Sequence, residues 1–320
     1  ATGVSGADAK PFRQTYALDA AKVRANAQRV AADLKEAPQA WKEAPAVYYA
    51  VPPLSDIRRL PDAYPADGAA LGTLDLLAAQ GEFEPGSFVV YPRADVDRFT
   101  LRAGDLKGKG GTIPASAIDI KLVKLWYQAG SAWCGEFNDP LGRLLVPEML
   151  LNDEDMLRVD PRTRDNYVRY SNGDGTFDHR WMSAMFSVVN YSRDNQANQA
   201  LINDAATLQP CVLNRDEFKQ FLVTVRIPDA AKAGRYTGTI TLAADGKNIG
   251  AVPLRVTVLP FRLPPPKTNH DIQKPFIFAP YLGYRDEYED ANLEDLANHN
   301  ALYPVNIISM STFAPDAFEA

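Results

Sequence analysis

The sequence predicts a mainly β protein: an antiparallel β-sandwich, preceded by an N-terminal helix and followed by the start of a unit of βα repeats that is cut short. Three observations predict this architecture. Between residues 46 and 261, short strand-like segments follow one another without intervening helices. An alanine-rich stretch near the beginning has helical periodicity. After a proline-rich segment near residue 265 the pattern changes to strand, helix, strand.

Length and composition set the broad class of protein. The chain has 320 residues, with 34 Lys+Arg against 40 Asp+Glu and a formal net charge of −6. This acidic balance argues against a dedicated nucleic-acid-binding protein, which carries a basic surface. No apolar run approaches the roughly 20 residues of a membrane-spanning helix. The hydrophobic content of 46% is that of a folded protein, and the 24 prolines favour loops and strand edges.

Residues 1–45 are predicted to form an N-terminal helical extension. Between residues 18 and 37 alanine dominates, and Val30 and Leu34 belong to a narrow apolar stripe among mixed charges. Asp19 is the expected N-cap, and Pro38 is expected to end the helix. We therefore expect a surface helix that packs on another element along this stripe.

Residues 46–263 are predicted to form the β-sandwich domain. Dense β-branched residues and alternating apolar side chains indicate strands with one buried face, and therefore antiparallel sheets. The dipeptide Asp245-Gly246 supplies a hairpin turn. The sequence KGKGG at residues 107–111 is a small basic turn, because it lacks the spacing of a phosphate-binding loop. The clearest strands are expected at residues 88–91, 118–127, 221–227, 236–242 and 249–259.

A second unit is predicted after a proline-rich linker at residues 264–269. Its segments at 276–279 and 305–310 have the composition of buried strands, with a helical stretch between them. Residues 270–320 are therefore expected to hold the first βα repeat and the second strand of a parallel sheet or barrel. One and a half repeats cannot cover both faces of a parallel sheet, so a partner or the remainder of a longer polypeptide is expected to complete it.

An ordered set of motifs resembles a known family. The motifs are AQGEFEPGSFVV (79–90), DLK (105–107), IPA (113–115), VKLWYQAG (123–130), TLQP (207–210), AGRYTGTI (233–240) and VLPFRLP (258–264). Together they resemble the N-terminal β-sandwich and first barrel strands of glycoside hydrolases similar to glycoside hydrolase family 123, over residues 54–312. The resemblance implies that residues 270–320 are the start of a (β/α)8 barrel that is cut short. It also implies a hydrolase that cleaves polysaccharide or N-acetylhexosaminide glycan and is secreted, periplasmic or at the cell surface.

The resemblance transfers no catalytic residue to this sequence. The family's Asp–Glu pair, which orients the acetamido group of the sugar and protonates the leaving oxygen, lies beyond residue 320. Within the chain, Asp286-Glu287 follows the first barrel strand, where barrel active sites lie, but acidic residues ahead of a helix are ordinarily favoured by its dipole. Further adjacent acidic pairs include Glu154-Asp155 and Asp216-Glu217. No cofactor is implied, and no metal site is expected because the three histidines are far apart.

Five side chains are candidates for contact with a carbohydrate. Tyr281, Tyr284 and Arg285 fill the loop after the first barrel strand, where aromatic faces and polar groups suit a sugar. The alternative for this loop is packing against the sandwich. Trp126 and Trp133 bound the densest aromatic segment, which can form the wall of a cleft. Inter-domain packing is the favoured role for this segment, because buried aromatics usually serve cores or interfaces.

The two cysteines, Cys134 and Cys211, each stand next to one of these motifs. We predict that they form one disulfide that staples two sandwich segments, as an oxidising compartment allows. The alternative to an enzyme is a non-catalytic cell-surface, filament-forming or carbohydrate-binding protein. In that case self-association through an exposed strand or helix replaces the remainder of the barrel as the partner interaction.

Overall fold

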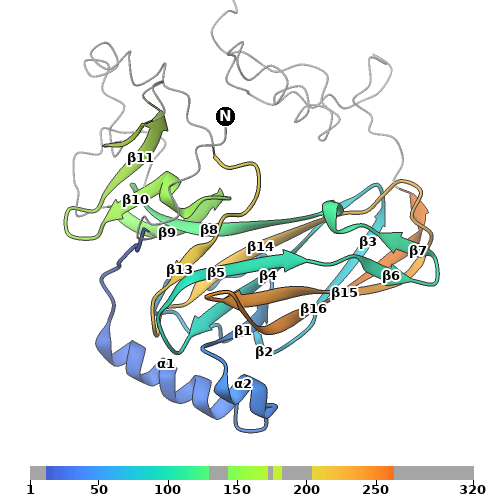
Figure 1. Ribbon diagram of the computed structural model, residues 1–320, viewed down its shortest axis with the longest axis horizontal. Coiled ribbons are helices and arrows are strands. Elements are labelled where there is room, and N and C mark those ends of the chain that lie inside the picture. Colours follow the sequence, from blue (N-terminus) through green and yellow to red (C-terminus); the bar gives the residue numbers. More distant parts are fainter. Residues whose placement is uncertain (1–11, 130–142, 172–175, 182–203, 263–320) are drawn as a thin grey trace, which may run out of the picture. The chain divides into compact units, whose positions relative to one another are not determined.

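The computed structural model describes residues 12–129, 143–171, 176–181 and 204–262. The chain divides into two compact units, Ala1–Arg262 and Leu263–Ala320, and all described residues belong to the first (Figure 1). This unit is mainly β with an N-terminal helix, which confirms the predicted fold class. The linker and the start of a barrel lie outside the described residues, so they stay predictions.

The described elements follow one another in three groups along the chain. The first group is α1 (Ala20–Asp33), α2 (Gln39–Glu43), β1 (Ala46–Val51), β2 (Ala69–Ala70), β3 (Leu74–Gln80), β4 (Phe83–Pro92), β5 (Val96–Ala103), β6 (Leu106–Gly108), β7 (Gly111–Ile113), the 3-10 helix η1 (Ala115–Ala117) and β8 (Ile118–Ala129). The second is β9 (Arg143–Leu151), the 3-10 helix η3 (Glu154–Met156), β10 (Leu157–Asp160), β11 (Asp165–Ser171) and β12 (Phe177–Trp181). The third is β13 (Cys211–Leu213), β14 (Lys219–Arg226), β15 (Gly234–Ala244) and β16 (Lys247–Arg262).

These strands form three sheets. A six-stranded sheet has the order β2-β1-β4-β14-β8-β9, and a seven-stranded sheet follows β13-β5-β15-β16-β3 with β6 and β7 attached through β15. The third sheet has three strands in the order β10-β11-β12. One pair departs from the predicted antiparallel arrangement, because β16 and β3 run parallel. The two strands are far apart in sequence, and β3 is followed directly by a turn at Gly81 that leads into β4 of the other sheet.

The main core lies between the six- and seven-stranded sheets. Phe88 of β4 stacks on Phe221 of β14 at 5.4 Å between ring centroids, and Phe99 of β5 approaches Phe221 at 5.9 Å from the other sheet. The inward residues of β8, β15 and β16 belong to the same buried cluster. The alternation in the sequence therefore identified the buried face of each of these strands.

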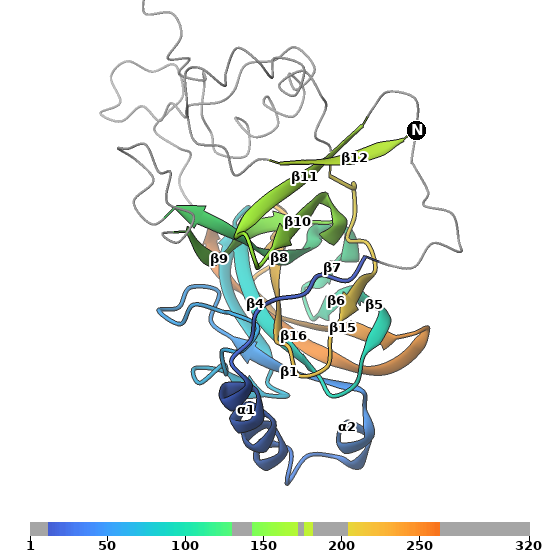
Figure 2. The same ribbon diagram turned by 90° about the vertical axis from the view of Figure 1, so that its left-hand side faces the viewer.

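Two strands of the six-stranded sheet, β1 and β4, are buried on both faces. One side of each strand faces the main core, and α1 covers the other side (Figure 2). In β4, Val89 and Tyr91 form a buried cluster with Val30 of α1 and with Leu34, which directly follows the helix, while the alternate residues face the main core. Double burial explains the uninterrupted apolar run at this strand. No helix in the described ranges is long and apolar enough to cross a membrane.

The start of α1 is as predicted, but its end is not. Asp19 caps the helix, since its Oδ1 accepts hydrogen bonds from the backbone N–H groups of Ala21 and Lys22 at 2.8 and 3.3 Å. The helix ends at Asp33, with Leu34 as C-cap, instead of continuing to Pro38. Leu34 turns into the buried cluster beneath α1, and Pro38 serves as the N-cap of α2.

Both turns singled out in the sequence are confirmed. Asp245 and Gly246 have φ angles of 48° and 80°, as a two-residue hairpin turn between β15 and β16 requires. The basic turn joins β6 and β7, which pair antiparallel from Leu106 opposite Ile113 to Gly108 opposite Gly111.

Gly250 in β16 is a position where a side chain should not fit. A Cβ atom there would lie 2.4 Å from the indole of Trp41, and the backbone has a φ of +147°. We expect Gly250→Ala to lower the free energy of unfolding by about 1–3 kcal/mol, as overpacking does. Urea unfolding checks this, with Gly104→Ala as control because its added Cβ would meet nothing closer than 3.5 Å. Equal stability of the two variants would contradict the expected clash.

Candidate functional site

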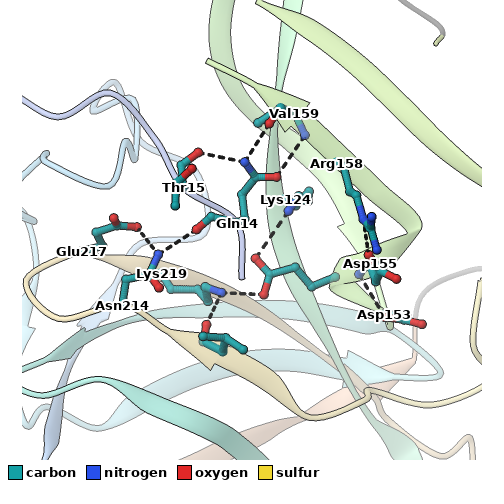
Figure 3. A network of polar contacts seen from close by, with 12 residues as sticks. Gln14, Thr15, Lys124, Asp153, Asp155, Arg158, Val159, Asn214, Glu217 and Lys219 are labelled. Carbon is teal, nitrogen blue, oxygen red and sulfur yellow. Dashed lines mark hydrogen bonds and ion pairs between the residues drawn. The ribbon is translucent and has the colours of Figure 1, made fainter. Parts of the chain in front are cut away.

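A cluster of buried charges lies where the main core meets the three-stranded sheet. Lys124 of β8 continues the inward row of Ile118, Ile120 and Leu122, and its side chain is 1% exposed. Lys219 of β14 stands two residues before Phe221, which is paired with Leu122. The two lysines are therefore cross-strand neighbours on the same face (Figure 3). Like charges in this arrangement destabilise a sheet unless something neutralises them.

Glu154 of η3 supplies the opposite charge between the two lysines. Its Oε2 accepts a 2.7 Å hydrogen bond from Lys219 Nζ, and its Oε1 lies 3.4 Å from Lys124 Nζ. Lys219 also donates to the carbonyl of Val212 at 2.5 Å. Glu154 is only 6% exposed, so the ion pairs form away from solvent. The three residues are called the buried triad below.

Burial and charge act against each other on the pKa values of the triad. Burial lowers the pKa of Lys124 to about 8, although Glu154 opposes this shift. Burial alone would raise the pKa of Glu154, but the ammonium groups of Lys219 and Lys124 outweigh it and hold that pKa below its usual value. Burial likewise disfavours the charge on Lys219, but Glu154 outweighs it and raises the pKa. The stable charge pattern at neutral pH is therefore an ionised Glu154 held mainly by Lys219.

Residues 12–16 cross over this region and are called the N-terminal strap. The side-chain amide of buried Gln14 donates to the carbonyl of Val159 at 2.9 Å, and its oxygen accepts from the N–H of Val159 at 2.9 Å (Figure 3). Val159 belongs to β10, the edge strand of the three-stranded sheet. Gln14 thus satisfies backbone groups that an edge strand otherwise presents to other chains.

The strap also makes contacts with the sandwich. The side chain of Asn214 donates to the Gln14 carbonyl at 2.7 Å and accepts from Arg13 at 2.6 Å. Arg13 also forms an ion pair with Asp97 at 2.5 Å. Phe12 presents its ring to Lys124, whose Nζ lies 5.3 Å from the ring centroid. The strap therefore joins the three-stranded sheet to the sandwich and covers the triad.

Removing the Gln14 amide should loosen this connection. We expect Gln14→Ala to lower the free energy of unfolding by about 1–3 kcal/mol, because Val159 loses both hydrogen bonds in a buried place. Hydrogen exchange should accelerate in β10 more than in β15. Thr15→Ala is the matched control, since the neighbouring residue is exposed and contributes only its backbone carbonyl. Unchanged exchange in β10 would show that the strap does not hold that strand.

A small cavity of about 20 Å³ adjoins the triad and is lined by Gln14, Tyr16, Lys124, Glu154, Asn214, Glu217 and Lys219, among others. This volume suits about one water molecule, not a sugar ring. Burial raises the pKa of the Glu217 carboxyl. Glu154 stays ionised, because the two lysines hold its pKa below the usual value. The arrangement can fix charges and hold the strap, but it has no room for a glycoside.

Most residues predicted to contact substrate lie outside the described ranges: Trp133, Tyr281, Tyr284 and Arg285. Trp126 is described, and its Nε1 donates to Glu148 at 2.7 Å while its ring packs on a small core that includes Leu151. Substrate contact by these five residues stays a prediction. Cys211 is buried at the start of β13, and Cys134 lies outside the described ranges, so the disulfide also stays a prediction.

Sequence reasoning missed the lysines of the triad. The available signal was their position, because Lys124 and Lys219 both stand at positions of alternating strands whose side chains point into the core. Glu154 was noticed only as half of an adjacent acidic pair. Among the residues that the structure describes, no three histidine, cysteine or acidic side chains are grouped so as to hold a metal ion.

Comparison with known proteins gives distant structural resemblances. No family model matches the chain, and no curated protein matches it. A family 123 glycoside hydrolase from Clostridium perfringens, studied for glycolipid glycan hydrolysis, matches 69% of this chain with 14% identity and a TM-score of 0.41. The chain spans only 28% of the length of that enzyme.

Two smaller domains also match. The seventh PapD-like (ASH) domain of human CEP192 has 7% identity and a TM-score of 0.22, covering 60% of this chain and 84% of that domain. The N-terminal domain of PorA has 8% identity and a TM-score of 0.21, covering 67% of this chain and 96% of that domain.

Proposed function

We propose that this chain is the accessory β-sandwich and the beginning of the catalytic barrel of a glycoside hydrolase that acts on polysaccharide or N-acetylhexosaminide glycan. The protein would be secreted, periplasmic or exposed at the cell surface. The sandwich supports the barrel, and the catalytic carboxylates come from sequence downstream of residue 320.

The observation that carries this proposal is the order of the family-like motifs. Five of the seven motifs fall mainly on β4, β6, β8, β15 and β16, and these strands belong to both sheets of the sandwich. The motif IPA lies at the end of β7, and TLQP directly precedes β13. The resemblance therefore concerns the sandwich as a whole and not one hairpin. The buried triad has no part in the proposed reaction, because glycoside hydrolysis needs two carboxyl groups with a sugar between them.

The test uses the protein encoded by the complete reading frame. We expect this frame to encode further βα repeats with an adjacent Asp–Glu pair, and the purified product to hydrolyse an aryl N-acetyl-β-hexosaminide. Replacing the Asp–Glu pair with amides should reduce the rate by at least about 100-fold, as loss of acid–base groups does. A Glu36→Gln variant, at an exposed residue after α1, serves as the control that should retain activity.

The alternative is a non-catalytic surface protein that assembles with copies of itself. A reading frame without an Asp–Glu pair, together with concentration-dependent assembly in sedimentation experiments, would replace the proposed enzyme by that alternative. Hydrolysis that persists in the amide variant would also contradict the proposal.

A further inference from the structure

One face of the three-stranded sheet combines exposed aromatic rings with fixed polar groups. The register pairs Tyr167 with Trp181, Arg169 with His179 and Ser171 with Phe177 across β11 and β12. Directly opposed residues in antiparallel strands point to the same face, so these six side chains share one side. Figure 2 shows β10, β11 and β12 next to one another. This side is called the β11–β12 face.

The β11–β12 face points away from the sandwich. Residues of the opposite parity make the contacts with β8 and β9: Val168 packs on the small core that includes Leu151 and Leu157. Asn166 exchanges hydrogen bonds with the backbone of Tyr127, at 2.8 Å to its N–H and 2.7 Å to its carbonyl. The inner side of the sheet is thus occupied by the protein itself, and the β11–β12 face is its outer side.

Two large aromatic side chains on this face are half exposed. Phe177 and Trp181 each have an exposed fraction of 49%. They are four residues apart on β12, which places their Cα atoms about 13 Å apart, given a rise of about 3.3 Å per residue. Tyr167 stands opposite Trp181 and extends the aromatic surface across the strands. This spacing suits two sugar rings of one oligosaccharide.

The polar side chains between the two rings are held in place. Arg169 forms ion pairs with Asp153 at 2.7 Å and Asp155 at 3.7 Å, and its guanidinium carbon lies 5.4 Å from the Phe177 ring centroid. His179 Nε2 lies 2.6 Å from the carbonyl oxygen of Asp155. Because these charges are balanced within the protein, the β11–β12 face does not favour a charged ligand over a neutral one.

Flat rings separated by fixed polar groups match a ligand with apolar faces and hydroxyl edges. A pyranose has this character. We infer that the β11–β12 face binds a neutral oligosaccharide, with Trp181 and Phe177 stacking on two of its rings. The choice of N-acetylhexosamine units rests on the proposed function.

The test titrates the whole chain with tri-N-acetylchitotriose and with maltotriose, following tryptophan fluorescence and heat. We expect saturable binding of the N-acetylated trimer. Trp181→Ala should weaken it at least tenfold, and Phe177→Ala about threefold or more. The matched control is Phe83→Ala, because Phe83 is similarly exposed, at 42%, but lies on the sandwich strand β4. Circular dichroism confirms that each variant is folded.

The outcomes separate this inference from the proposed function. Absence of saturable binding, or equal binding by wild type and Trp181→Ala, overturns the inference even if the complete enzyme cleaves glycans. Trp181-dependent binding supports it even if the complete reading frame has no hydrolase activity. Trp181-dependent dimerisation in sedimentation, without trimer binding, overturns it in favour of a protein interface.

Discussion

Replacing Glu154 by glutamine is expected to lower the free energy of unfolding by about 3–5 kcal/mol, the cost of breaking a buried ion pair. Glutamine keeps the size of the side chain but removes its charge. Lys124 and Lys219 then face each other across neighbouring strands, with exposed fractions of 1% and 16% and no counter-charge between them. Urea unfolding at pH 7, extrapolated to water, measures the loss.

Two further variants show whether the charge is responsible. Glu36→Gln makes the same change at an exposed residue after α1 and should alter stability by no more than about 0.5 kcal/mol. Lys124→Met added to Glu154→Gln should recover part of the loss, because only Lys219 then remains charged. A loss below about 1 kcal/mol for Glu154→Gln alone would refute the buried triad as a stabilising unit.

The pH dependence of Lys124 gives the second large effect. Its pKa is about 8 in the folded protein against 10.5 for an ordinary lysine. Below pH 8 the folded and unfolded chains both carry the proton, and folding must bury the charge. Between pH 8 and 10.5 the unfolded chain binds more protons at this side chain, so its contribution to stability rises with pH. A pKa lowered from 10.5 to about 8 corresponds to about 3 kcal/mol.

A comparison with Lys124→Met isolates this contribution from other groups that titrate. We expect the variant to be close to wild type at pH 7, since an apolar side chain of similar size often replaces a buried charge without loss. At pH 10.5 wild type should have gained about 3 kcal/mol relative to the variant. Lys22→Met, at a lysine whose side chain is 60% exposed, should run parallel to wild type. Parallel curves for Lys124→Met as well would show that Lys124 does not titrate at a lowered pKa.

The strands that were easiest to predict are those with one buried face and a local turn. Residues 118–127, 221–227 and 236–242 alternate in the sequence, and β8, β14 and β15 cover most of these positions. The three-stranded sheet was not predicted. Its outer side carries Tyr167, Phe177 and Trp181, so the contrast between polar and apolar sides is weak. Alternation is informative only where one side of a strand is polar.

The site was harder to predict than the fold. The inward position of Lys124 is visible in the sequence, but a lysine is almost never fully buried unless it is paired with an opposite charge. Its burial depends on Glu154 and on the strap, and the contacts of Gln14 with Val159 span 145 residues. No local pattern connects these segments.

The sequence by itself determined the local features: the cap at Asp19, the turn at Asp245-Gly246 and the inward row of each alternating strand. Each depends on residues within a few positions of one another, whose backbone preferences and spacing are fixed by chemistry. Only the tertiary structure decided that β3 runs parallel to β16 and that two lysines share one buried carboxylate. Burying a charge is costly unless a partner arrives from elsewhere in the chain, and the order of residues along one strand does not reveal that partner.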